Sequence, residues 1–134
     1  MLSDSVKIAA AGMRAQGERL KVVAQNIANS SATGSTPGSE PYRRKTVAFE
    51  NVLNRELGIE TVKITKYGQD NSDFISRYEP SHPAANEQGY VLYPNVNPIV
   101  EMMDMREARR GYEANMNVIE VSKAMLARTL DLLR

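Results

Sequence analysis

One long repeat of apolar side chains occupies the last third of the chain and sets what the rest can fold into. Between Met102 and Leu133, apolar residues recur in steps of three and four, which predicts a helix with a heptad stripe along one side. Gly111 is the only glycine in this segment, and no proline interrupts it. A helix of this length is a rod of roughly 50 Å at about 1.5 Å per residue, so it needs a long partner to cover its apolar side.

The stripe of this C-terminal helix is wider than a single partner helix requires. Val118, Met125 and Leu132 form a second row at seven-residue spacing beside the main stripe. A two-stranded coiled coil needs only one such seam. We therefore expect this helix to contact more than one neighbour.

The N-terminal residues carry a second heptad stripe, which begins at Leu2 and ends at Ile27. Small residues around Gly12 keep the first half of this predicted helix thin, so another helix could approach closely. One interpretation is an ordinary amphipathic helix that covers the core of its own domain. The other is that the two terminal helices pair antiparallel and still leave apolar surface for further neighbours.

The middle of the chain changes character. Residues 32–41 are rich in Gly, Pro, Ser and Thr and predict a mobile loop or linker. Thr46–Glu50 could be a short strand, or its end could belong to a helix over Phe49–Leu57, and the pattern leaves both open. Alternating or β-rich segments predict extended pieces at Glu60–Tyr67, Asp73–Tyr78 and Gly89–Pro94, the first two joined by a turn at 68–72.

These elements predict a mainly α fold with a small β-rich insert. We expect long N- and C-terminal helices that pack as a coiled-coil-like pair, with an extended loop and a short β-hairpin region between them. The predicted divisions are an N-terminal helix at 1–30, a loop and β-rich insert at 31–96, and a C-terminal helix at 97–134.

Several classes of function find no support in the composition. The 17 basic and 16 acidic residues are spread along the chain, so nucleic-acid binding is not expected. Without cysteine there is no thiolate ligand or nucleophile, and the single histidine, His82, lies in a predicted loop without a catalytic partner motif. We expect no enzyme activity, no cofactor and no metal, and no apolar segment is long enough for membrane insertion.

The single basic run, Arg43-Arg44-Lys45, has two interpretations. It could be a solvated loop end, or it could contact an acidic strip on a neighbouring subunit. The first residues also lack the basic start and apolar run of a secretory signal, which favours either a cytosolic protein or export by a route that reads no such signal.

Ordered motifs along the whole chain resemble one family. Asn26-Ile27-Ala28-Asn29 resembles the Asn-x-x-Asn signature that ends the first helix of bacterial flagellar rod, hook and related axial proteins. Further segments are similar to the proximal rod members of that family: Pro41-Tyr42-Arg43-Arg44, Tyr78-Glu79-Pro80-Ser81-His82-Pro83, Gly89-Tyr90-Val91, Pro94-Asn95-Val96-Asn97 and Tyr112-Glu113-Ala114-Asn115.

This resemblance implies a structural subunit of the proximal rod of the flagellar basal body, in the periplasm. It implies self-assembly through the terminal helices, transmission of torque, and export by the flagellar type III apparatus without a cleaved signal peptide. The implied partners are other copies of the chain, other rod proteins and the protein that joins the rod to the membrane ring. A cytosolic helical adaptor or export chaperone is the alternative.

The two stripes and the Asn signature together define an expected assembly interface. In the N-terminal helix it comprises Leu2, Val6, Ala9, Met13, Leu20, Val23, Asn26, Ile27 and Asn29. In the C-terminal helix it comprises Met105, Tyr112, Asn115, Met116, Ile119, Leu126, Leu130 and Leu133.

Overall fold

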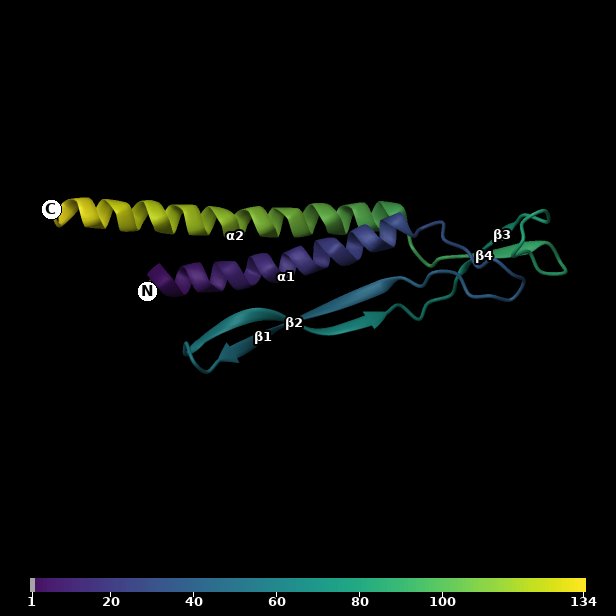
Figure 1. Cartoon of the computed structure of the whole chain (residues 1–134), viewed down its shortest axis with the longest axis horizontal. Helices are drawn as coiled ribbons and strands as arrows, with labels where there is room; N and C mark the ends of the chain where they lie inside the picture. Colours follow the sequence, from purple (N-terminus) through teal and green to yellow (C-terminus); the bar gives the residue numbers. More distant parts are fainter. Residues whose placement is uncertain (1) are drawn as a thin grey trace. The chain divides into compact units, whose positions relative to one another are not determined.

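The computed structural model describes residues 2–134 and contains two long helices separated in the chain by two small β-sheets (Figure 1). The elements are α1 (Leu2–Ala28), β1 (Lys45–Asn54), β2 (Ile59–Gln69), β3 (Ile75–Tyr78), β4 (Tyr90–Tyr93) and α2 (Pro98–Leu132). The prediction of long terminal helices around a small β-rich insert is therefore confirmed.

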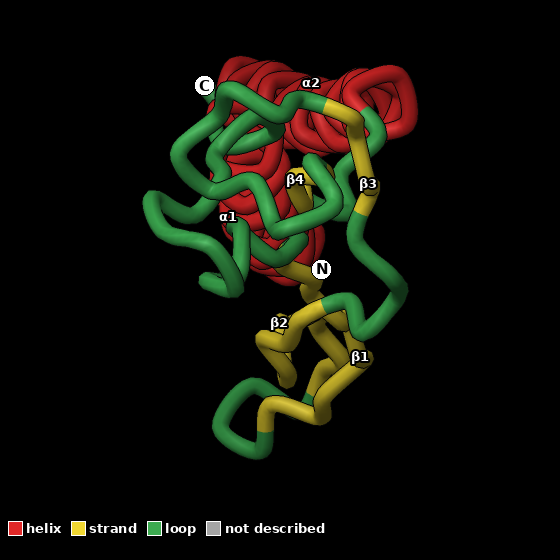
Figure 2. The backbone as a smooth tube through the Cα atoms, turned by 90° about the vertical axis from the view of Figure 1, so that its right-hand side faces the viewer, coloured by secondary structure: helices red, strands yellow, loops and turns green. Residues whose placement is uncertain are grey.

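The chain divides into two units. The first unit contains the described residues of Met1–Leu20 together with Val47–Lys66 and Arg106–Arg134, and the second contains Lys21–Thr46 and Tyr67–Met105. Each helix contributes one part to each unit. The parts of α1 and α2 that belong to the first unit lie side by side (Figure 1, Figure 2).

Within the first unit the two helices are antiparallel and close together. Gly12 lies against Asn115 and Gln16 lies against Gly111, while the Arg19 guanidinium pairs with Glu107 at 3.3 Å. Residues later in α1 therefore contact residues earlier in α2, as in any antiparallel helix pair. Small side chains permit this approach, because buried alanines such as Ala9 and Ala108 place little bulk between the two backbones.

The tightest point of this helix pair is Gly12. A methyl group added there would lie 2.7 Å from the Asn115 amide nitrogen, which itself donates to the Gly111 carbonyl at 2.8 Å. We expect Gly12→Ala to lower the free energy of unfolding by about 1–3 kcal/mol, since overpacking outweighs the gain in helix propensity. Urea denaturation of the purified chain measures this change.

Gly17→Ala is the matched control for Gly12→Ala. A methyl group added at Gly17, on the same helix, meets no atom within 4 Å. It should raise stability by up to about 1 kcal/mol, because alanine favours the helix over glycine. Equal stabilisation by both substitutions would show that Asn115 gives way freely and that the helix contact is loose.

A β-hairpin belongs mainly to the first unit. β1 and β2 form a two-stranded sheet connected by the short turn at 55–58. The open choice at Thr46–Glu50 is thereby settled in favour of the strand, and the alternative helix over Phe49–Leu57 is absent because β1 continues to Asn54. Arg19 of α1 lies 6.0 Å from the centroid of the Phe49 ring, which places the hairpin against that helix.

The second sheet lies in the second unit and differs from the prediction. The sequence predicted that Glu60–Tyr67 and Asp73–Tyr78 are joined by a turn, but β3 pairs with β4. β3 and β4 are antiparallel, with Ile75 opposite Tyr93 and Tyr78 opposite Tyr90. The expected connection through 68–72 does not join two paired strands, because β2 pairs with β1 instead. Asn95 explains part of the difference: its amide donates to the carbonyls of Asp70 and Ser72, which fixes this segment as a link and not as a hairpin turn.

The core of the second unit is small and very well buried. Val91 and Val96 are almost fully inaccessible, and Pro94 lies beside them in the chain with a fully buried side chain. The same unit contains the loop predicted at residues 32–41. The Tyr42 amide donates to the Ala32 carbonyl at 3.0 Å, which joins the two ends of the loop, and the Ser39 amide donates to the Thr36 carbonyl at 3.1 Å. The loop is confirmed, and its mobility stays a prediction.

Candidate assembly interface

The structure places the expected interface residues at three levels of burial. Ala9, Val23 and Asn26 are buried within the chain. Half-buried positions are Leu2, Val6, Met13, Leu20, Ile27, Asn29, Met105, Tyr112, Asn115 and Ile119. Exposed positions are Met116, Leu126, Leu130 and Leu133, all in the first unit.

The face of α2 that contacts α1 is made of small and polar residues. Glu101, Ala108 and Ser122 are buried at seven-residue spacing, and Asn115 occupies the same row. This row is not the apolar stripe predicted from the sequence. The large apolar side chains lie on its flanks, because positions three or four residues away are rotated to either side of it.

Consequently the C-terminal half of α2 presents a broad apolar surface. Its exposed members are Met116, Val118, Val121, Met125, Leu126, Leu130 and Leu132, together with Leu133, which directly follows the helix. Monomeric proteins rarely expose so many large apolar side chains on one element unless the surface meets a partner. We call these eight residues the apolar flanks of α2.

A buried polar cluster occupies the second unit where α1 ends and α2 begins. Asn26 is 1% exposed, and its amide nitrogen donates to the Lys45 carbonyl at 2.9 Å and to the Glu101 carboxylate at 3.3 Å. Its amide oxygen accepts hydrogen bonds from the Tyr42 hydroxyl at 2.8 Å and the Lys45 amide at 2.9 Å. Asn26, near the end of α1, therefore contacts Glu101 of α2, the first residue of β1 and Tyr42 just before that strand, all within the chain.

Asn29, the other member of the Asn signature, has a local role. Its side-chain amide donates to the Gln25 carbonyl at 2.8 Å, and its backbone amide donates to the same carbonyl at 3.0 Å. Membership of Asn26 and Asn29 in an interface between subunits stays a prediction.

The charge at the centre of this cluster is neutralised by Arg44. The Arg44 guanidinium forms an ion pair with Glu101, whose side chain is 1% exposed, and approaches Asp70 and Asp104 at 3.6 Å each. Burial lowers the pKa of Arg44, but the hydrogen bond and charge of Glu101 and the two aspartates outweigh it and raise the pKa. Arg44 thus pairs with acids of its own chain, which corrects the solvated-loop interpretation for this residue. Contact of the basic run with an acidic strip on a neighbouring subunit stays a prediction.

Two neighbours of the cluster have shifted pKa values. Two effects raise the pKa of Tyr42: mainly its partial burial, and also the negative charge of Glu101. Its hydroxyl therefore stays protonated and can donate to Asn26. Hydrogen bonds from Ser72 hold the pKa of Asp70 below its usual range. Because this pKa is lower in the folded chain than in the unfolded chain, Asp70 contributes stability above about pH 4 that is lost as the pH falls further.

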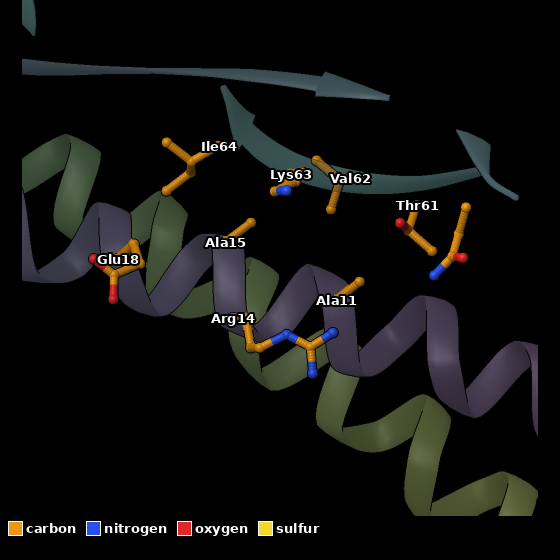
Figure 3. A pocket seen from close by; sticks show the side chains of 9 residues that line it. Ala11, Arg14, Ala15, Glu18, Thr61, Val62, Lys63 and Ile64 are labelled. Carbon is orange, nitrogen blue, oxygen red and sulfur yellow. The ribbon is translucent and has the colours of Figure 1, made fainter. Parts of the chain in front are cut away.

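A groove of about 370 Å³ lies between α1 and the hairpin in the first unit (Figure 3). Ala11 and Ala15 of α1 point toward β2, and Val62 and Ile64 of β2 point back toward the helix. Arg14 and Glu18 of α1 also line the groove. Residues 2–134 contain no group of side chains arranged to hold a metal ion, and none of their helices is long and apolar enough to cross a membrane.

Comparison with known proteins relates this geometry to one family. The sequence profile of the flagellar basal body rod FlgEFG protein C-terminal family matches residues 87–132, which include all of α2. A flagellar basal-body rod protein FlgC from Agrobacterium fabrum is 50% identical over 133 residues, which cover 99% of this chain and 96% of that protein. The chain belongs to the FlgC family of flagellar basal-body rod proteins.

More distant members of the FlgC family agree. The protein so named from Bacillus subtilis is 36% identical over 96% of this chain and 95% of its own length. The one from Borreliella burgdorferi is 37% identical over 99% of this chain and 98% of its own. This family member is a structural subunit of the basal-body rod and assembles with other rod components; the alternative of a cytosolic adaptor or export chaperone finds no support.

The predicted sites and the structure differ in one instructive way. The stripe residues of α2 were found by periodicity, but the buried pair of Arg44 and Glu101 was missed. Arg44 and Glu101 are 57 positions apart in the sequence, which hides the pairing. The sequence did contain a signal for this pair. Glu101 stands among the apolar residues that begin α2, and a glutamate there must either face solvent or pair with a buried cation.

Proposed function

We propose that this subunit builds part of the proximal rod in the periplasm and that its terminal helices carry the assembly contacts. The observation that supports this proposal is the pair of apolar flanks on α2. The intrachain helix contact uses the small and polar row of α2 and leaves these flanks exposed. Full burial of one leucine side chain contributes about 1.5–3 kcal/mol, so covering several of them would drive association.

The same contacts would transmit torque. A shaft made of separate chains must resist shear without covalent links, and many apolar contacts acting in parallel meet that need. The expected neighbours are other copies of this chain, other rod proteins and the protein that joins the rod to the membrane ring. The flagellar type III export apparatus would deliver the chain to the rod, because the chain's resemblance to the family implies that route and not cleavage of a signal peptide.

Localisation and motility test the proposal together. In a host that lacks its own copy of this protein, an epitope-tagged chain should restore swimming in soft agar and should be recovered in purified basal bodies. The host with an empty vector is the control. Recovery of the tagged chain only in the cytosolic fraction, with swimming restored, would contradict a structural role in the rod.

A further inference from the structure

The loop at residues 32–41 is held to the rest of the second unit at one point. Within residues 2–134, its hydrogen bonds and ion pairs to segments beyond Tyr42 consist of one contact, between the Thr33 hydroxyl and Nε2 of His82 at 3.3 Å. Its other hydrogen bonds join loop residues to one another or to the adjoining residues Asn29 and Tyr42. Loss of the contact with His82 would therefore free the loop, whose residues 35–38 are exposed.

His82 is the only histidine of the chain, and both of its ring nitrogens make hydrogen bonds. The Ala84 amide donates to Nδ1 at 3.0 Å. A backbone amide can only donate, so Nδ1 carries no proton in this arrangement. The neutral ring then carries its proton on Nε2, which donates to the Thr33 hydroxyl. The contact with the loop therefore depends on one tautomer of the neutral ring.

The backbone around His82 holds the Ala84 amide in place. The His82 amide donates to the Glu79 carbonyl at 3.0 Å, and the Ala85 amide donates to the His82 carbonyl at 3.0 Å. Between them, Pro83 has a fixed φ. If Nδ1 gained a proton, two N–H groups would face each other, and the ring would turn because the backbone is fixed. Both nitrogens belong to one rigid ring, so this turn also moves Nε2 away from the loop.

The charged groups around His82 balance one another. The centroid of the Tyr93 ring lies 6.5 Å from that of the His82 ring. The Tyr93 hydroxyl donates to both carboxylate oxygens of Glu79, and the Arg77 guanidinium lies 4.4 Å from the centroid of the same tyrosine ring. One acid and one base thus share this tyrosine and offset each other. The remaining acids of the two loops are exposed, so solvent screens their charges; they are Glu40 and Glu87.

We propose that His82 is a proton-sensitive latch, which holds the loop at residues 32–41 when the ring is neutral and releases it when the ring is protonated. The chain has no second histidine and no cysteine, and histidine is the side chain whose charge ordinarily changes between about pH 5 and pH 8. This inference goes beyond the proposed function, because it concerns the folded subunit itself. It makes the loop an ordered surface at neutral pH and a mobile one in acid.

Electron paramagnetic resonance of a nitroxide label on the loop tests the latch. The chain contains no cysteine, so Ser35→Cys gives a single label at an exposed position two residues after Thr33. The purified chain would be compared at about pH 8 and about pH 5.5, on either side of the pKa of about 6.5 that an ordinary histidine has. We expect slow rotation of the label at the higher pH and several-fold faster rotation at the lower pH.

Three variants of the labelled chain assign the response to the latch. Thr33→Val removes the hydroxyl and nearly keeps the size of the side chain, so the label should rotate fast at both pH values. Thr33→Ser is its matched control, because it keeps the hydroxyl and should retain the pH response. His82→Gln has an amide that stays neutral over this range, so the label should have the same mobility at both pH values.

Four results would each overturn the latch. They are equal mobility of the label at both pH values in the chain that carries only Ser35→Cys, a pH response that persists in His82→Gln, slow rotation at about pH 8 in Thr33→Val, and loss of the response in Thr33→Ser. Circular dichroism of every variant at both pH values would show that the helices persist, which separates release of the loop from unfolding.

Discussion

Arg44→Met should lower the free energy of unfolding by about 3–5 kcal/mol, because it leaves the Glu101 carboxylate buried without its cation. The Glu101 side chain is 1% exposed, so water does not replace the guanidinium. The remaining donor, the Asn26 amide at 3.3 Å, is neutral and cannot balance the charge. Chemical denaturation of the purified chain, followed by circular dichroism, measures the loss.

Two further variants show whether the loss comes from the buried charge. Arg106→Met removes an exposed guanidinium from α2 and should change stability by less than about 0.5 kcal/mol. Glu101→Gln combined with Arg44→Met removes both charges and should recover a substantial part of the loss, because the glutamine is neutral. Equal loss in the single and the double variant would instead assign the effect to lost packing of the long arginine side chain.

Periodicity was sufficient to predict the two helices but not the face that each presents to the other. A stripe of large apolar residues is the strongest pattern in α2, so it suggested the contact with α1. The structure puts Ala108 and Asn115 in that contact instead, opposite Gly12. The sequence did indicate the close approach at Gly12, and Asn115 was among the expected interface residues. The buried row that contains Ala108 was not predicted, because small residues give a weak hydrophobic pattern.

The sequence also did not predict which distant segments of the chain contact one another. The strands at Glu60–Tyr67 and Asp73–Tyr78 exist, but their partners are β1 and β4, and local patterns carry no information on partners. The Asn signature was recognised by resemblance, and the structure gives Asn26 a physical task within the chain. Its contact with Glu101 spans 75 residues, so it follows only from the folded arrangement of the two helices.

Leu126→Asp should abolish incorporation into the rod and swimming while leaving the isolated chain as stable as the wild type. Leu126 is 49% exposed, and it follows Met125, which lies in a groove beside the start of α1. An aspartate there stays in contact with water in the free subunit, so stability should change by less than about 0.5 kcal/mol. In the rod the same carboxylate would be buried in an apolar contact, which costs several kcal/mol without a partner.

Ala124→Asp is the matched control for Leu126→Asp, because it adds the same charge to an exposed position of the same helix turn. Two residues rotate the side chain by about 200°, so Ala124 points away from the leucine side. We expect this variant to swim and to appear in basal bodies at the wild-type level. Circular dichroism and sedimentation would confirm that both isolated chains remain folded, which attributes any difference to the contacts between subunits. Normal swimming of Leu126→Asp would show that this flank of α2 faces solvent in the rod.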